Sequence, residues 1–128
     1  MRALANYRRT SVESASNEDL VVLLLEAAVQ RQHNADAAMV AHDRSAWNKE
    51  LNVARAIFLE LLGAFDPETP AEVLAPMAAT YRWLIHHLNE AARNGDRVRL
   101  GQTLEVSGTV LDTWTRALKI HRGEEGGA

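Results

Sequence analysis

The chain has 128 residues, of which 47% are hydrophobic and 24% charged, with a net charge of −3 and no cysteine. These values indicate one folded domain and argue against wholesale disorder. The lack of cysteine excludes a disulfide scaffold, a thiolate metal site and a cysteine nucleophile. The charge balance gives no general attraction to nucleic acid or to an anionic membrane. The longest apolar run, Leu20 to Leu25, is far shorter than the ~20 residues that cross a bilayer, and the N-terminus has no apolar signal core. We therefore expect neither membrane insertion nor secretion by a signal peptide.

The composition favours helix, because alanine and leucine are abundant and both are strong helix formers. Residues 1–15 are polar and show no sustained period. A first helix is expected from about Asn17 to Ala41, with Ser16 as its N-cap and acidic residues in its first turn. A short break at residues 42–45, where Asp43 or Ser45 can cap, leads to a second amphipathic helix from about Ala46 to Ala64.

The second half of the chain contains two further helix patterns. Thr69 as N-cap, Pro70 and Glu72 predict the start of a third helix, in which Pro76 should cause a kink or delay the regular part. Asn94-Gly95-Asp96 ends it and caps a fourth helix that runs beyond Leu118. Four helices joined by short loops predict an all-α, antiparallel up-down four-helix bundle over residues 16–120. An extended N-terminal strap at residues 1–15 precedes it, and a flexible tail at residues 121–128 follows.

The sequence contains no pattern typical of a catalyst. No pair of Glu-x-x-His motifs offers a di-iron site, no glycine spacing matches a phosphate loop, and no serine has an obvious His and acid pattern. We therefore expect a protein that is not an enzyme and needs no cofactor. One alternative is a small metal- or ligand-binding protein, since His86 and Glu90 share a helical face and a distant His33 could join them. Exposed surface histidines are the commoner explanation for such a pattern.

The first two helices carry more apolar surface than one neighbour can bury. Residues 21–25 cover more than half of the helix circumference, and residues 56–62 do the same on the second helix. One interpretation is a wide helix packed on two neighbours. Another is a groove that receives the amphipathic helix of a partner, and a third is a self-complementary face in a structural helical dimer.

Read in order, several segments resemble the flagellin export chaperone family, FliS. The resemblance rests on Asn6–Ser16, Leu20–Ala28, Ala54–Leu61, Tyr81–Trp83, Leu88–Ala91 and Trp114. The second segment is similar to the family's Leu-Ile-x-Met-Leu-Tyr-x-Gly-Ala run, and the third to its Ala-x-x-Ile-Ile-x-Glu-Leu run. Their order, the loop positions and the aromatic landmarks make the whole specific. The chain departs from the pattern at Leu25, Ala27, Pro76 and Ala91-Ala92, and at Arg31-Gln32, a position that is usually apolar.

The resemblance implies a cytoplasmic chaperone that binds the disordered C-terminal segment of flagellin. It would prevent premature polymerisation and hold flagellin for type III export. Export gate components or a co-chaperone are further candidate partners, and the protein is expected to be a monomer or a weak dimer. The residues expected to contact the partner are Tyr7, Val12, Leu20, Leu23, Leu24, Ile57, Phe58, Leu61, Tyr81, Leu84, Ile85 and Leu88. Of these, Tyr7 and Val12 should cover part of the exposed apolar patch in the free protein, as a strap that the partner displaces.

Overall fold

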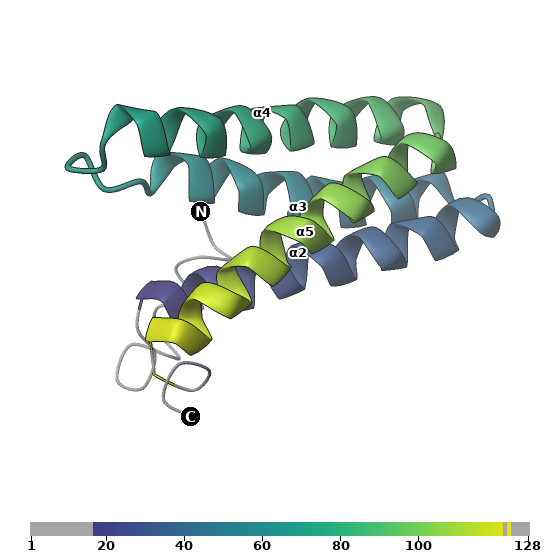
Figure 1. Cartoon of the computed structure of the whole chain (residues 1–128). Helices are drawn as coiled ribbons and strands as arrows, with labels where there is room; N and C mark the ends of the chain where they lie inside the picture. The colour runs from purple at the N-terminus through teal and green to yellow at the C-terminus, as the bar shows by residue number, and fades with distance from the viewer. Residues whose placement is uncertain (1–16, 122, 124–128) are drawn as a thin grey trace.

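The computed structural model describes residues 17–121 and 123, and it is a bundle of helices (Figure 1). These helices are α2 (Asn17–Val40), α3 (Arg44–Gly63), α4 (Ala71–Asn94) and α5 (Arg97–His121). No strand occurs in this part of the chain. The predicted helical bundle is confirmed, with helix bounds within about two residues of those expected from caps and periodicity. The expected strap and all but two residues of the expected tail lie outside the described residues.

The helix ends follow local chemistry. The Asp43 carboxylate accepts a hydrogen bond from the backbone N–H of Ala46 at 3.1 Å and so caps α3. Just before it, His42 has a φ of 56°, which reverses the chain after α2. The predicted cap at Thr69 is wrong, because Pro70 is the N-cap of α4. A turn explains this difference. The backbone carbonyl of Asp66 accepts a hydrogen bond from the backbone N–H of Thr69, which places Thr69 outside the helix.

Pro76 does not delay α4. The helix is continuous from Ala71 to Asn94, and the N–H groups of Val73 and Leu74 both bond to the carbonyl of Pro70. Figure 1 shows no sharp bend in it. Pro76 is the sixth residue of α4, so it removes one bond of the helix ladder without ending the helix.

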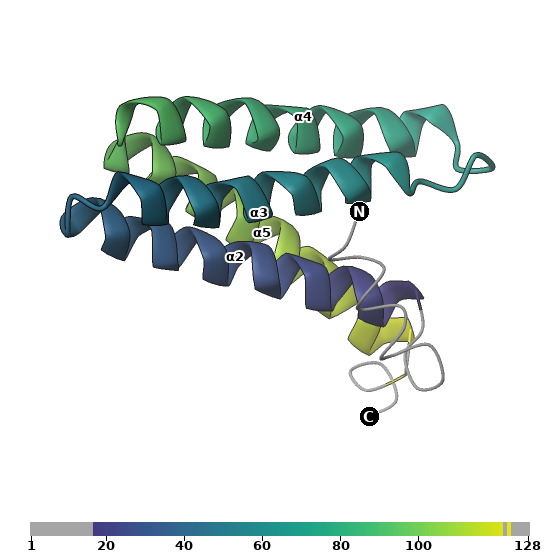
Figure 2. The same ribbon diagram turned by 180° about the vertical axis from the view of Figure 1, so that it is seen from behind.

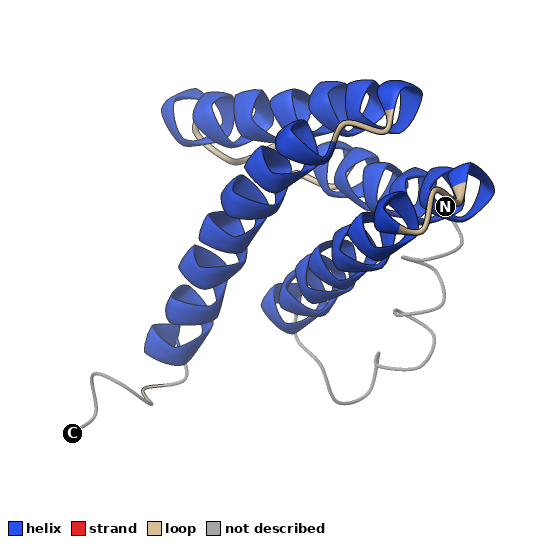
Figure 3. Ribbon diagram, turned by 90° about the vertical axis from the view of Figure 1, so that its right-hand side faces the viewer, coloured by secondary structure: helices blue, strands red, loops and turns tan. Residues whose placement is uncertain are grey.

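Each helix packs on two neighbours: α2 and α4 both pack on α3 and on α5. The α4–α5 pair has the smallest contact, and Figure 3 shows why. The two helices lie close together at the loop that joins them and separate along their length. The view from behind in Figure 2 shows α2 and α3 side by side, closest near the loop that joins them. The bundle therefore has a closed end at the α4–α5 loop and an open end, where α2 and α4 begin.

The closed end is held by Trp47 and Gly95. The indole N–H of Trp47 on α3 donates to the carbonyl of Ala92 on α4 at 2.8 Å. Gly95 ends α4 with a φ of 60°, and a Cβ atom at this position would lie 3.0 Å from the Trp47 ring. Only glycine can adopt this positive φ and lie this close to the Trp47 ring without strain, so the α4–α5 turn packs directly against the indole.

Candidate functional site

An apolar groove lies between α4 and α5 where the two helices separate. It has a volume of about 300 Å³ and is lined by Met77, Thr80, Tyr81, Thr109, Val110, Thr113, Trp114 and Ala117. None of these side chains is charged. We call this surface the α4–α5 groove.

The threonines in the α4–α5 groove contribute methyl groups rather than free donors. The hydroxyl of Thr80 donates to the carbonyl of Pro76 at 3.0 Å, and that of Thr113 donates to the carbonyl of Thr109 at 2.9 Å. Thr109 makes the same kind of bond to Glu105. Because each hydroxyl proton is already bonded one turn back, the groove is suited to an apolar occupant.

A second concavity, here called the end hollow, opens at the same end of the bundle. It has a volume of about 470 Å³ and is formed by the start of α2, the end of α3, the α3–α4 loop and the start of α4. Its rim is polar, with Asn17, Glu18, Asp66 and Thr69, and its floor is apolar. Both concavities share three lining residues, which makes them one continuous surface: Met77, Tyr81 and Trp114.

Tyr81 is the centre of this surface. Its ring is stacked on Phe65 with centroids 5.8 Å apart and tilted against Phe58 at 5.9 Å. Burial raises the pKa of the Tyr81 phenol, and a hydrogen bond from the Trp114 indole acts in the opposite direction. The phenol is therefore neutral at physiological pH, and Tyr81 adds no charge to the surface.

The structure places the expected contact residues in different environments. Leu20, Leu24, Leu61 and Tyr81 line the end hollow. Leu23 is exposed on α2 and Ile85 is half-buried on α4. The others among the described residues are core side chains that line neither concavity: Ile57, Phe58, Leu84 and Leu88. Tyr7 and Val12 lie outside the described residues. A role in partner binding stays a prediction for all of them.

Sequence reasoning missed the α5 wall of the groove. Thr109, Val110, Thr113 and Ala117 recur at three- and four-residue steps, which is a helical stripe. The signal was hidden because threonine is a polar residue type, although here its hydroxyl is bonded to a carbonyl of its own helix. Met77 was not among the expected contact residues, and it lines both concavities.

The metal-binding alternative finds no support in the geometry. Among residues 17–121 and 123, no group of three or more His, Asp or Glu side chains lies close enough together to hold a metal ion. His33, His86 and Glu90 are therefore not assembled into a site. The described helices also include none that is long and apolar enough to cross a membrane.

The fold and the site together define a helical bundle whose open end has an uncharged groove and an adjoining hollow with an aromatic floor and a polar rim. Such a surface is typical of a protein that receives an apolar segment of another chain. The sequence matches the family described as Flagellar protein FliS over residues 1–121, and the chain belongs to this family. That membership supports a role as a flagellar chaperone. A comparison with curated proteins found no match.

Proposed function

We propose that this protein is a cytoplasmic secretion chaperone that binds the C-terminal segment of flagellin, prevents its polymerisation and holds it for type III export. The observation that carries the proposal is the uncharged α4–α5 groove, which shares Met77, Tyr81 and Trp114 with the apolar floor of the end hollow. Membership of the FliS family supports the flagellar partner. The proposal involves neither catalysis nor a cofactor.

Binding of this kind couples folding of the partner to association. A disordered segment loses conformational entropy when it becomes ordered, so the apolar area that it buries must outweigh that loss. The α4–α5 groove suits this task, because its lining has no charged group that would have to be desolvated.

Calorimetric titration of the full-length protein with a flagellin C-terminal peptide tests the proposal. We expect 1:1 binding, a negative heat-capacity change and a gain of helix in the peptide. Thr113→Arg, which places a charge at an exposed position of the groove wall, should weaken binding at least about tenfold. Val98→Arg is the matched control, because Val98 is 76% exposed at the closed end. No detectable binding at about 50 µM peptide would refute the proposal.

The N-terminal strap belongs to the same proposal. Asn17 and Glu18, the first described residues, line the end hollow, so residues 1–15 join the bundle beside the proposed site. We propose that Tyr7 and Val12 cover part of this surface until the partner displaces them. Deleting residues 1–12 should then raise dye binding and speed amide exchange at residues 81–88 while helix content is kept. Unchanged dye binding and protection after the deletion would show that the segment is only a tail.

A structural dimer is a separate hypothesis, and light scattering distinguishes it from a chaperone. If the apolar surface is self-complementary, light scattering will show a dimer that does not dissociate when the flagellin peptide is added. A chaperone that is a monomer or a weak dimer will instead form a 1:1 complex.

A further inference from the structure

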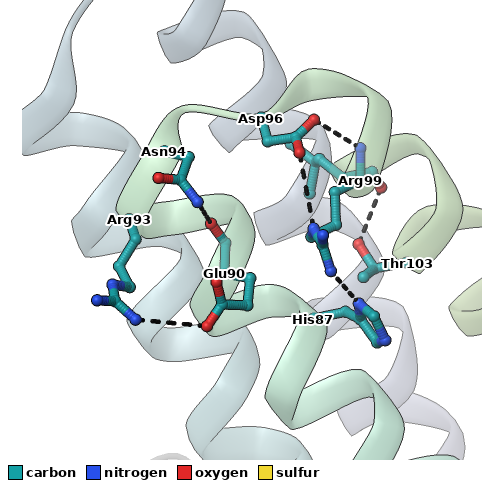
Figure 4. A network of polar contacts seen from close by, with 8 residues as sticks. His87, Glu90, Arg93, Asn94, Asp96, Arg99 and Thr103 are labelled. Carbon is teal, nitrogen blue, oxygen red and sulfur yellow. Dashed lines mark hydrogen bonds and ion pairs between the residues drawn. The ribbon is translucent and has the colours of Figure 1, made fainter.

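A contact between His87 and Arg99 joins α4 to α5 near the closed end (Figure 4). The guanidinium Nη1 of Arg99 lies 2.6 Å from Nδ1 of His87. A guanidinium is always a donor, so Nδ1 must accept and the imidazole must be neutral, with its proton on Nε2. If His87 were protonated, its Nδ1–H would face the N–H of Arg99, and the two positively charged side chains would repel each other. The contact therefore exists only while His87 is neutral.

Arg99 is held in place for this contact. The Asp96 carboxylate accepts the backbone N–H of Arg99 at 3.0 Å and lies 3.6 Å from its side-chain Nε. That Nε is buried and has no hydrogen-bond partner in the part of the chain that the structure describes. The ion pair with Asp96 therefore favours a position of the guanidinium near the first turn of α5.

The other charged groups around His87 do not cancel the opposition of Arg99 to its protonation. On its own helix, His86 is the next residue and opposes protonation, whereas Glu90 favours it. Desolvation is the largest cause that lowers the pKa of His87 below the usual 6.5. From α5, the charge of Arg99 also opposes protonation of His87. From α3, Arg55 contacts Asn89, which lies on another face of α4. His87 therefore changes charge below the pH at which a free histidine does.

The contact lies where a small change of angle has a large effect. It joins residues near the α4–α5 loop, whereas the residues that line the α4–α5 groove lie further from that loop along the same two helices. From Arg99 to Lys119 the helix rises about 30 Å, so a rotation of about 10° at the contact moves the far end by about 5 Å. The α4–α5 pair is the smallest helix contact in the bundle, so α5 is held mainly by its packing on α2.

We infer that the His87–Arg99 contact is a pH-sensitive latch that sets the angle between α4 and α5, and with it the width of the α4–α5 groove. At neutral pH the latch is closed; on acidification the two cations repel and α5 moves away from α4. The consequence for partner binding rests on the proposed function. The movement itself is a property of the free protein and is tested without any partner.

The chain suits a spin-label distance measurement, because it has no native cysteine. Labels at Ala79→Cys on α4 and Lys119→Cys on α5 occupy exposed positions beside the groove. We expect the distance between them to increase by several ångströms between about pH 7.5 and about pH 5.5, with a midpoint below the ordinary histidine value. An unchanged distance would overturn the inference.

Two variants and one control decide whether His87 is the cause. His87→Asn keeps an acceptor near the Nδ1 position but cannot be protonated, so the distance should stay short at both pH values. Arg99→Gln removes the opposing cation and should also abolish the response, which covers the case that His87→Asn does not fold. His86→Asn is the matched control: it keeps the His87–Arg99 contact, so the distance should still increase, with a midpoint at higher pH because His86 opposes protonation of His87. A pH response that survives in both folded variants would overturn the inference, even if flagellin binding is confirmed.

Discussion

At the scale of single residues, Gln32 is the least expected member of the core. It is fully buried on α2, and its side-chain N–H₂ donates to Ser107 at 2.9 Å and to the carbonyl of Ala28 at 3.2 Å. Its side-chain oxygen is buried without a partner among the described residues. The sequence showed only that Gln32 interrupts an apolar stripe. Which residue would meet it could not be predicted, because Ser107 is far away in the chain and reaches it only through packing.

The Gln32–Ser107 pair should show strong non-additivity. Ser107→Ala removes one bond and leaves a buried N–H unpaired, which should cost about 1 kcal/mol of the free energy of unfolding. The double variant Gln32→Met, Ser107→Ala removes both partners and the unpaired oxygen with little change in volume. It should be close to wild-type stability or above it. Urea unfolding checks this, and a double variant less stable than Ser107→Ala would contradict it.

Asp36 on α2 and Arg97 on α5 form a two-bond ion pair near the closed end. The carboxylate accepts from Nε of Arg97 at 2.8 Å and from Nη2 at 3.2 Å. The Arg97 hydrogen bonds lower the pKa of Asp36 below 3.8, against the opposing effect of desolvation, and the Arg97 and His33 charges lower it further. Because the folded pKa is below the unfolded one, the stabilisation is present above about pH 3.8 and is lost as the pH falls through the folded value.

We expect Arg97→Gln to raise the pKa of Asp36 towards its ordinary value of 3.8. Titration of the carboxyl carbon by NMR measures this directly. Arg93→Gln serves as the control, since Arg93 pairs with Glu90 on the exposed side of α4 and should leave Asp36 unchanged. An Asp36 pKa that is the same in Arg97→Gln and wild type would contradict the assignment of cause.

At the scale of elements, the α4–α5 turn depends on one glycine. Gly95→Ala must place a Cβ atom 3.0 Å from the Trp47 ring at a φ of 60°. We expect a loss of about 1–3 kcal/mol in the free energy of unfolding. Gly101→Ala is the matched control: it lies inside α5 with no atom within 4 Å of the added methyl group, and it should stabilise by about 0.5–1 kcal/mol. Similar effects at the two positions would contradict this account.

The helices could be predicted from the sequence because their signals are local. Asp43 caps α3 through the residue three places ahead, and Gly95 ends α4 through its own backbone. The α4–α5 groove could not be predicted, because it arises from the angle between two helices rather than from either alone. The helical stripe that contains Ile57 and Phe58 is buried in the core of the free protein, and its contact with a partner stays a prediction.

At the scale of the whole molecule, the closed and open ends should differ in dynamics. The closed end has Trp47 bonded to α4 and Asp36 bonded to α5, whereas the outer part of α5 has separated from α4. We expect amides at residues 110–119 to exchange faster than amides at residues 51–58 in α3, and to slow down when a partner occupies the groove. Hydrogen-exchange mass spectrometry checks both statements. Equal protection of the two stretches in the free protein would contradict the first.

The shared position of Trp114 also has an optical consequence. The chain has three tryptophans: Trp47 is buried at the closed end, Trp83 is exposed, and Trp114 is half-buried where the two concavities meet. Replacing the first two by phenylalanine would leave a single indole fluorophore at the proposed site. A segment entering the α4–α5 groove would displace water from that indole and shift its emission to shorter wavelength. The protein therefore carries a built-in reporter of occupancy that needs no added dye.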